Sequence, residues 1–221
     1  MKLLINALIK FLIGLLLVGL LIFLPAGTLA YPGGLLFLCL LFIPMLIMGV
    51  VMFTRAPDLL RKRLDAKEKQ GDQKGVVAFS GLIFLGGFVL AGLDFRFGWS
   101  KIPLPVVIAA SVVFLIGYAL YAEVMRENAY LSRTVKVEEG QTVISTGLYG
   151  VVRHPMYTAT ILMFLSLPLV LGSLYALIPF AVYPALMVIR IRGEEKLLTA
   201  ELAGYDEYKK RVKYRMIPFI W

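Results

Sequence analysis

The chain has 221 residues, of which 60% are hydrophobic and only 17% are charged. An average soluble domain carries about 25% charged residues, so this composition excludes an ordinary soluble protein and predicts an integral membrane protein. The formal charge of +9 is spread over links between hydrophobic segments, where the basic character of cytoplasmic loops explains it. No nucleic acid partner is therefore expected.

Metal chemistry is not expected either. Cys39 is the single cysteine and His154 the single histidine of the chain. One residue of each kind provides neither a disulfide framework nor a zinc or haem ligand set.

Hydrophobic runs of about 20 residues predict helices that cross a membrane. Six runs follow one another, at about 4–24, 35–53, 76–93, 104–125, 155–171 and 174–189. The first is too long for a secretory signal peptide and has no small-residue cleavage site after it, so we expect a retained anchor. The predicted fold is all-α, a polytopic transmembrane bundle of about six spans that includes a C-terminal helical hairpin.

The charges of the links predict the orientation in the membrane. The link 55–75 carries seven basic and four acidic residues, which is typical of a cytoplasmic loop. The link 94–103 has few charges and contains Trp99, as expected at the outer interface. We therefore predict a multi-pass protein of the cell's inner membrane with both termini on the cytoplasmic side. Leu59, Leu60 and Leu64 allow a short amphipathic helix in the first link, but a solvated loop is the preferred interpretation.

Two features of the middle spans carry alternative explanations. Glu123 lies near the inner end of the fourth run, and a carboxylate within a membrane helix is a functional candidate, although pairing with Arg126 explains it more simply. The third run is rich in glycine, which permits close approach of helices in lipid.

The sequence GLYGVVRHPMY, residues 147–157, joins a polar loop to the last hydrophobic hairpin. The two arms of that hairpin have nearly equal lengths, so residues just before and just after it end at the same level. His154 is therefore expected near Arg190, Glu194 and Glu195, in a polar cup at the inner face of the membrane.

Each of these residues also has a simpler explanation when taken alone. Arg153 could be an interfacial anchor before Pro155 at the first turn of a helix. Arg190 and Glu194 could be a solvated pair four residues apart on a helix. His154 could merely cap the start of the hairpin. Their combination at one level of the hairpin favours a functional site.

The order and spacing of several blocks carry a resemblance to a known family. GLYGVVRHPMY, the hairpin, RIRGEE, GYDEYKKRV and RMIPFIW together resemble the isoprenylcysteine carboxyl methyltransferases and, more loosely, the wider group of membrane methyltransferases that includes phospholipid N-methyltransferases. The resemblance is strongest over residues 127–221. It implies a single membrane methyltransferase domain, 1–221, with an N-terminal four-helix part, 1–126, and a cofactor-binding catalytic part, 127–221.

The resemblance implies that S-adenosylmethionine binds at the inner face and that a lipophilic or lipidated acceptor comes from the membrane. Cofactor contacts are then expected from Gln141, Leu148, Tyr149, Val152, His154, Tyr157 and Glu195. Arg190 and Glu194 match the family's positions next to the reaction centre. Arg190 could orient an acceptor carboxylate, and Glu194 could take up a proton from an amine or thiol.

The sequence departs from the family at two positions. Leu148 stands where proline is common, and Ala159 where glycine is frequent. Neither change removes a reacting group, but both bear on the shape of the acceptor channel.

The tail 196–212 has apolar residues on one helical stripe, and Gly204 is expected to divide it into two pieces. It is predicted either to close over the cofactor or to lie passively on the surface. Two rival functions remain open at this stage. One is an NADPH-dependent membrane reductase of the sterol reductase type, whose C-terminal hairpin is similar, and the other is a non-enzymatic lipid-binding protein.

Overall fold

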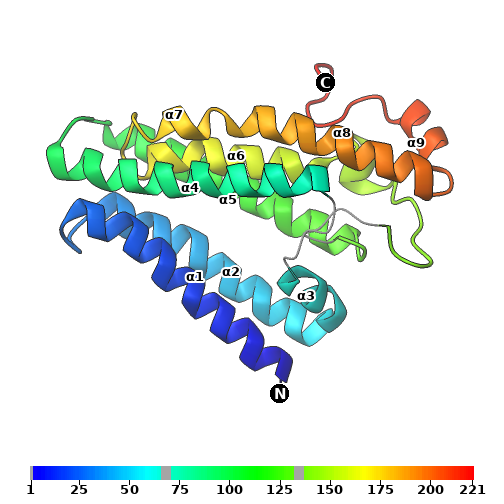
Figure 1. Ribbon diagram of the computed structural model, residues 1–221, viewed down its shortest axis with the longest axis horizontal. Helices are drawn as coiled ribbons and strands as arrows, with labels where there is room; N and C mark the ends of the chain where they lie inside the picture. The colour runs from blue at the N-terminus through cyan, green and yellow to red at the C-terminus, as the bar shows by residue number, and fades with distance from the viewer. Residues whose placement is uncertain (1, 66–70, 132–136) are drawn as a thin grey trace.

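The structure is a computed structural model that describes residues 2–65, 71–131 and 137–221, and these residues form helices and turns without any strand (Figure 1). The helices are α1 (Lys2–Ala26), α2 (Pro32–Arg55), α3 (Pro57–Leu64), α4 (Gly71–Phe97), α5 (Leu104–Glu127), the 3-10 turn η1 (Gly147–Gly150), α6 (Pro155–Val170), α7 (Leu177–Phe180), α8 (Tyr183–Glu201) and α9 (Tyr205–Arg211). The predicted all-α bundle is confirmed.

Four helices in the described residues are long and apolar enough to cross a membrane. They are Lys2–Ala26, Pro32–Arg55, Gln73–Phe97 and Leu104–Glu127. The fifth predicted span forms the apolar helix α6, which has 16 residues and is therefore about 24 Å long. The chain is thus a multi-pass membrane protein.

The sixth predicted span, 174–189, differs from expectation. It is divided into the short helix α7 and the first part of α8, with a turn at residues 181 and 182. Pro184 lies in the first turn of α8, where a proline lacks no hydrogen bond but cannot continue a preceding helix. From Tyr183 the helix continues without interruption to Glu201, well beyond the hydrophobic run.

The α1–α2 hairpin is inclined to the main bundle and approaches it closely at the α1–α2 turn (Figure 1). At the other end of α2, Met48 and Met52 pack with Val124 and Met125 of α5. Glycines make the close contacts at the joined end. A Cβ atom on Gly92 would lie 2.5 Å from the carbonyl oxygen of Ile22, and one on Gly33 would lie 2.6 Å from that of Leu171. The hairpin and α4 therefore form a fork whose closed end is fixed by backbone packing.

The main bundle is built on the contact between α5 and α6. A Cβ atom on Gly117 would lie 2.9 Å from the carbonyl oxygen of Ala159 and 2.8 Å from the side chain of Met163. Ala159 is fully buried in this contact. Its small side chain therefore serves the packing of two helices.

A buried carboxylate joins the turns at the end where the α1–α2 hairpin closes. Asp94 accepts hydrogen bonds from the backbone nitrogen and the hydroxyl of Ser100, both at 2.7 Å, and from the hydroxyl of Ser173 at 2.5 Å. It is 1% exposed. These bonds fasten the α4–α5 turn to the turn after α6.

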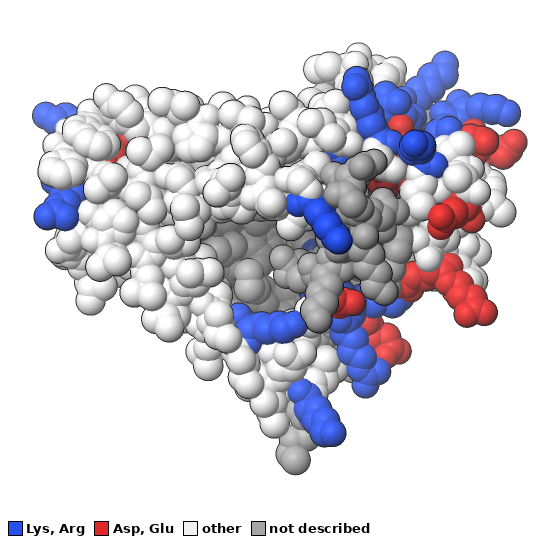
Figure 2. All heavy atoms as spheres, in the orientation of Figure 1, with Lys and Arg blue, Asp and Glu red and all other residues white. Residues whose placement is uncertain are grey.

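Charged side chains gather at the opposite end of the molecule, over α3 and α9, and a wide uncharged surface separates them from a smaller group (Figure 2). Both chain termini lie toward this charged end (Figure 1). This distribution is that of a protein whose uncharged middle faces hydrocarbon.

The loop preferred for the link after α2 is wrong in its first part, because residues 57–64 form helix α3. Leu59 and Leu60 are buried, so the apolar face of α3 packs on the protein. Lys67 and Lys69 of the same link lie outside the described residues. The pairing expected for Glu123 is confirmed, since Arg126 donates to its carboxylate at 2.8 and 2.5 Å.

Candidate active site

The C-terminal end of α5 is hydrogen-bonded to η1, the turn at which the site begins. The carboxylate of Glu127 accepts a hydrogen bond from the backbone nitrogen of Leu148, at 3.0 Å. The side-chain amide of Asn128 donates to the hydroxyl of Tyr149 at 2.9 Å. Gly147 has a φ of 52°, and a Cβ atom there would lie 1.5 Å from the carboxylate of Glu127. Only glycine fits at this position, which explains the first residue of the 147–157 block.

The C-terminal segment runs beside the start of α6 and fixes it. The backbone nitrogens of Arg153 and His154 donate to the carbonyl oxygens of Tyr214 and Arg215, at 2.9 and 2.8 Å. The hydroxyl of Thr158 donates to the carbonyl of Met216 at 2.7 Å. Segments about 60 residues apart in the chain are thereby held together at the entrance to α6.

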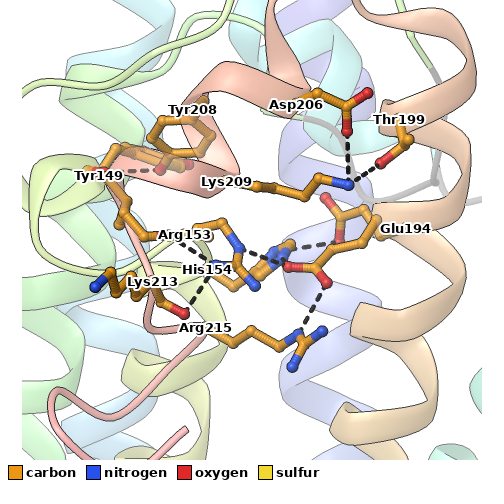
Figure 3. A network of polar contacts seen from close by, with 12 residues as sticks. Tyr149, Arg153, His154, Glu194, Thr199, Asp206, Tyr208, Lys209, Lys213 and Arg215 are labelled. Carbon is orange, nitrogen blue, oxygen red and sulfur yellow. Dashed lines mark hydrogen bonds and ion pairs between the residues drawn. The ribbon is translucent and has the colours of Figure 1, made fainter.

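Glu195 of α8 lies at the centre of a buried ionic cluster. Its partners Arg153, His154 and Arg215 are labelled in Figure 3. Its carboxylate accepts from Arg153 Nε at 2.7 Å and from Arg215 Nε at 2.8 Å, and His154 Nε2 lies 3.3 Å away. Arg153 also donates to the carbonyls of Val212 and Lys213. Burial alone would raise the pKa of Glu195, but hydrogen bonds from these three partners outweigh it and lower the pKa to about 2. The carboxylate is therefore ionised at neutral pH.

A second polar chain lies beside this cluster and begins at Tyr157. The Tyr157 hydroxyl donates to Glu194 at 2.7 Å and accepts from Arg190 Nε at 3.1 Å. Arg190 Nη1 donates to the side-chain oxygen of Gln73 at 3.3 Å. Gln73 belongs to α4 and is 2% exposed, so the N-terminal half of the chain contributes to the site.

Helix α9 covers the site from the side opposite α6. The hydroxyl of Tyr208 donates to the backbone carbonyl of Tyr149 at 2.7 Å (Figure 3). Leu202, Tyr205, Tyr208 and Val212 pack into one apolar cluster under α9. Gly204, with a φ of 82°, separates α9 from α8, which confirms the predicted break.

Tyr205 of α9 differs from Tyr208 in the hydrogen bonding of its hydroxyl. Its side chain is 3% exposed, yet its hydroxyl has no hydrogen-bond partner among the described residues. Burial and the nearby carboxylates of Glu195 and Glu194 raise the pKa of Tyr205 above its usual range, so the hydroxyl keeps its proton. A buried donor without a partner is costly in the absence of a ligand.

A cavity of about 90 Å³ lies between α6, α8, α9 and the segment before η1. Of the residues predicted to form the site, six line it: Gln141, Tyr149, His154, Tyr157, Arg190 and Glu194. Leu148, Val152 and Glu195 do not line it, and Glu195 lies behind Arg153 and His154 instead. The predicted proximity of His154 to Glu194 and Glu195 is confirmed, with nitrogen to oxygen distances of 3.9 and 3.3 Å.

The simpler explanations considered for Arg153, Arg190 and Glu194 do not hold, whereas His154 does occupy the N-cap position of α6, without a side-chain capping bond. Arg153 is 7% exposed and paired with Glu195, so it is no interfacial anchor. Arg190 is 8% exposed, and both Arg190 and Glu194 bond to Tyr157, so they are not a solvated pair.

The sequence interpretation did not assign Gln73, Tyr205 or Arg215 to the site. A glutamine at the start of a span has no distinctive spacing, so only the fold reveals Gln73. Tyr205 and Arg215 could have been found, because they belong to the GYDEYKKRV and RMIPFIW blocks that carry the resemblance.

Comparison with known families agrees with this geometry. Residues 105–204 match the model of the phospholipid methyltransferase family. The predicted relationship to the membrane methyltransferases is confirmed. The matched region contains η1, α6, α7, α8 and all of α5 except Leu104. It therefore includes Tyr157, Arg190 and Glu194 but not Gln73.

A second comparison finds the Delta(14)-sterol reductase TM7SF2 of Mus musculus. It is 35% identical over 91 residues, which are 40% of this chain and 22% of the reductase. The chain thus spans about a fifth of the length of that relative.

Proposed function

We propose that the protein is an S-adenosylmethionine-dependent methyltransferase of the inner membrane that acts on a lipophilic acceptor at the cytoplasmic face. The observation that carries the proposal is the position of the Tyr157, Glu194 and Arg190 chain. It lies on the wall of a polar cavity inside the region that matches the phospholipid methyltransferases.

The residues of the cavity suit this cofactor chemically. S-adenosylmethionine, when bound, supplies a methyl group on a positively charged sulfur. Its ammonium and sulfonium charges are stabilised by a carboxylate and by aromatic faces. Glu194 provides the carboxylate, and Tyr149 and Tyr157 provide the aromatic faces. Its carboxylate and purine call for donors, which His154 and the unpartnered hydroxyl of Tyr205 provide.

The remaining predicted contacts have less direct roles in this proposal. Gln141 lines the cavity through the segment before η1. Leu148 and Val152 shape the turn around Tyr149. Glu195 acts through the two residues that it fixes, Arg153 and His154.

The cavity volume requires a movement. At about 90 Å³ it is smaller than the roughly 300 Å³ at the lower end of small-molecule sites. We propose that α9 moves away from η1 to admit the cofactor and then closes again. In the closed position, Tyr208 of α9 donates to the carbonyl of Tyr149, and Arg153 donates to the carbonyl of Val212 at the end of α9. This assigns the tail the covering role rather than the passive one.

Catalysis in this site would consist mainly of positioning and exclusion of water. Arg190, fixed by Gln73 and Tyr157, can orient a carboxylate acceptor. Glu194 has carboxylate lone pairs beyond the one used by Tyr157 and can take the proton released by an amine or thiol acceptor.

Calorimetric titration of the purified protein with S-adenosylhomocysteine tests the proposal. We expect binding by the wild type and an affinity roughly tenfold lower in Tyr157→Phe, because the two charge-assisted bonds that position Glu194 and Arg190 are lost. Thr160→Val on the same helix serves as a control for the substitution itself. No binding by a folded wild-type protein would refute the proposal.

The sterol reductase relative supports a second candidate, an NADPH-dependent membrane reductase. The two candidates differ in the nucleotide that they bind. Titration of the same sample with NADPH decides between them, since binding of NADPH without S-adenosylhomocysteine would favour the reductase.

A further inference from the structure

A second cavity, of about 400 Å³, lies in the fork between the α1–α2 hairpin and the main bundle. It is lined by Leu17, Val18, Leu21, Phe37, Leu41, Gly81, Phe84, Leu85, Phe88, Phe114, Phe164 and Leu167. The lining comes from the four membrane-length helices and α6, and it contains no polar side chain. Figure 2 shows the surface hollowed along this fork.

The size and chemistry of this cavity identify the kind of molecule that fits. An apolar cavity of about 150 Å³ excludes water and binds benzene. By proportion, about 400 Å³ accommodates one hydrocarbon chain of about 15 carbons. Two chains of that length would not fit.

The cavity lies along the same helices as the polar site. On α4, Gly81 follows Gln73 by eight residues, which is about 12 Å along the helix axis. On α8, Tyr183 precedes Arg190 by seven residues, or about 10 Å. The ring of Tyr183 packs against Phe84 and Phe164 of the cavity wall, with centroid distances of 6.3 and 4.8 Å.

We propose that this cavity receives one hydrocarbon chain of the methyl acceptor, with the reactive group at Arg190 and Glu194. The inference rests on the proposed function and names its substrate class. The acceptor is a lipid in which about 10 Å separates the methylated atom from a hydrocarbon chain of about 15 carbons.

Two glycines of α4 provide a matched test. A Cβ atom on either Gly81 or Gly86 would meet nothing within 4 Å, but only Gly81 lines the cavity. Gly81→Leu therefore fills the cavity without a backbone clash, and Gly86→Leu adds the same side chain to the same helix outside it. Both replacements favour the helix over glycine.

The experiment reconstitutes the full chain in phosphatidylcholine nanodiscs and adds palmitic acid with a mid-chain diazirine. After illumination we expect labelled peptides from α1 and α4 in the wild type and Gly86→Leu. Overfilling a packed site reduces affinity roughly tenfold or more, so labelling should fall by that factor in Gly81→Leu. Undiminished labelling in Gly81→Leu would overturn the inference.

A second arm places the diazirine in the phosphatidylcholine itself. Labelling of the cavity by this lipid as efficiently as by palmitic acid would identify the occupant as bulk bilayer lipid and overturn the acceptor assignment.

A third arm measures methyl transfer from labelled cofactor into a total membrane lipid extract. We expect the roughly tenfold loss in Gly81→Leu alone, with unchanged affinity for S-adenosylhomocysteine. Equal transfer by Gly81→Leu and Gly86→Leu would overturn the chain assignment. The absence of any transfer or S-adenosylhomocysteine binding by the wild type would instead refute the proposed function, whatever the photolabelling shows.

Discussion

Replacement of Glu195 by glutamine tests the role of the ionic cluster behind the candidate site. The carboxylate is 8% exposed and is bonded to Arg153, His154 and Arg215. Its pKa falls from 4.5 to about 2, and a difference of this size corresponds to about 3 kcal/mol of interaction favouring the ionised form. Glutamine keeps the shape of the side chain but loses that charge, so Arg153 becomes a buried cation paired only with backbone carbonyls.

For a protein of 150–250 residues, each kcal/mol shifts the midpoint of thermal unfolding by about 2 to 4 °C. The expected decrease for Glu195→Gln is therefore roughly 6 to 12 °C, measured by tryptophan fluorescence or circular dichroism in detergent.

Glu194→Gln is the matched control, since the neighbouring residue is also a glutamate on α8. Its carboxylate accepts from Tyr157 and faces the cavity, so its loss should reduce methyl transfer with a smaller change in the melting temperature. If Glu195→Gln melted within about 1 °C of the wild type, an interaction of about 3 kcal/mol would be excluded. Glu195 would then be better explained as a ligand contact than as the centre of a structural cluster.

Three further predictions follow from single contacts. Gly147→Ala should destabilise the protein by about 1 to 3 kcal/mol, because of its positive φ and the clash with Glu127, whereas Gly150→Ala should cost less; thermal unfolding of both variants checks this. Tyr205→Phe should raise the stability of the ligand-free protein by about 1 kcal/mol, because it removes a buried donor without a partner. It should lower the affinity for S-adenosylhomocysteine about two- to tenfold, since the lost hydroxyl is bonded only when ligand is present; equal affinities by calorimetry would contradict the assignment. Because the folded pKa of Glu195 is lowered, its stabilisation is complete above pH 4.5 and is lost as the pH falls toward 2; unfolding curves across this interval should show a larger acid loss in the wild type than in Glu195→Gln.

The hydrophobic pattern was sufficient to predict the spans, because a membrane helix is determined by length and composition alone. It failed at the sixth span, where Pro184 begins a new helix within an apolar run. It also favoured a loop over α3, because the many charges of the link outweighed the helical spacing of its leucines, two of which are buried.

The candidate site was predictable in part for a geometric reason. The two arms of the C-terminal hairpin have nearly equal lengths and place His154 level with Glu194 and Glu195. This holds although the second arm is interrupted between α7 and α8. The length of a helical path changes little when one turn is rearranged, so the level of its ends is preserved.

The pattern could not show which of these polar residues face the ligand. Glu194 and Glu195 are adjacent in sequence, yet one lines the cavity and the other is enclosed by three cationic or imidazole side chains. Adjacent helix positions point about 100° apart, and the partners that decide their roles come from the C-terminal segment.

The N-terminal part of the chain contributes to the site through α4, which the sequence did not indicate. Gln73 reaches Arg190 from α4, and a Cβ atom on Gly193 would lie 2.1 Å from the Gln73 amide. The glycine in RIRGEE is thus explained by a residue that lies about 120 positions earlier and outside the family match. The apolar cavity likewise takes most of its lining from α1, α2 and α4. The family match covers the cofactor side of the proposed site, while the acceptor side is built largely from helices that it does not reach. The match over residues 105–204 thus supports the proposed type of reaction, and the proposed acceptor is tested best by changes in the N-terminal helices.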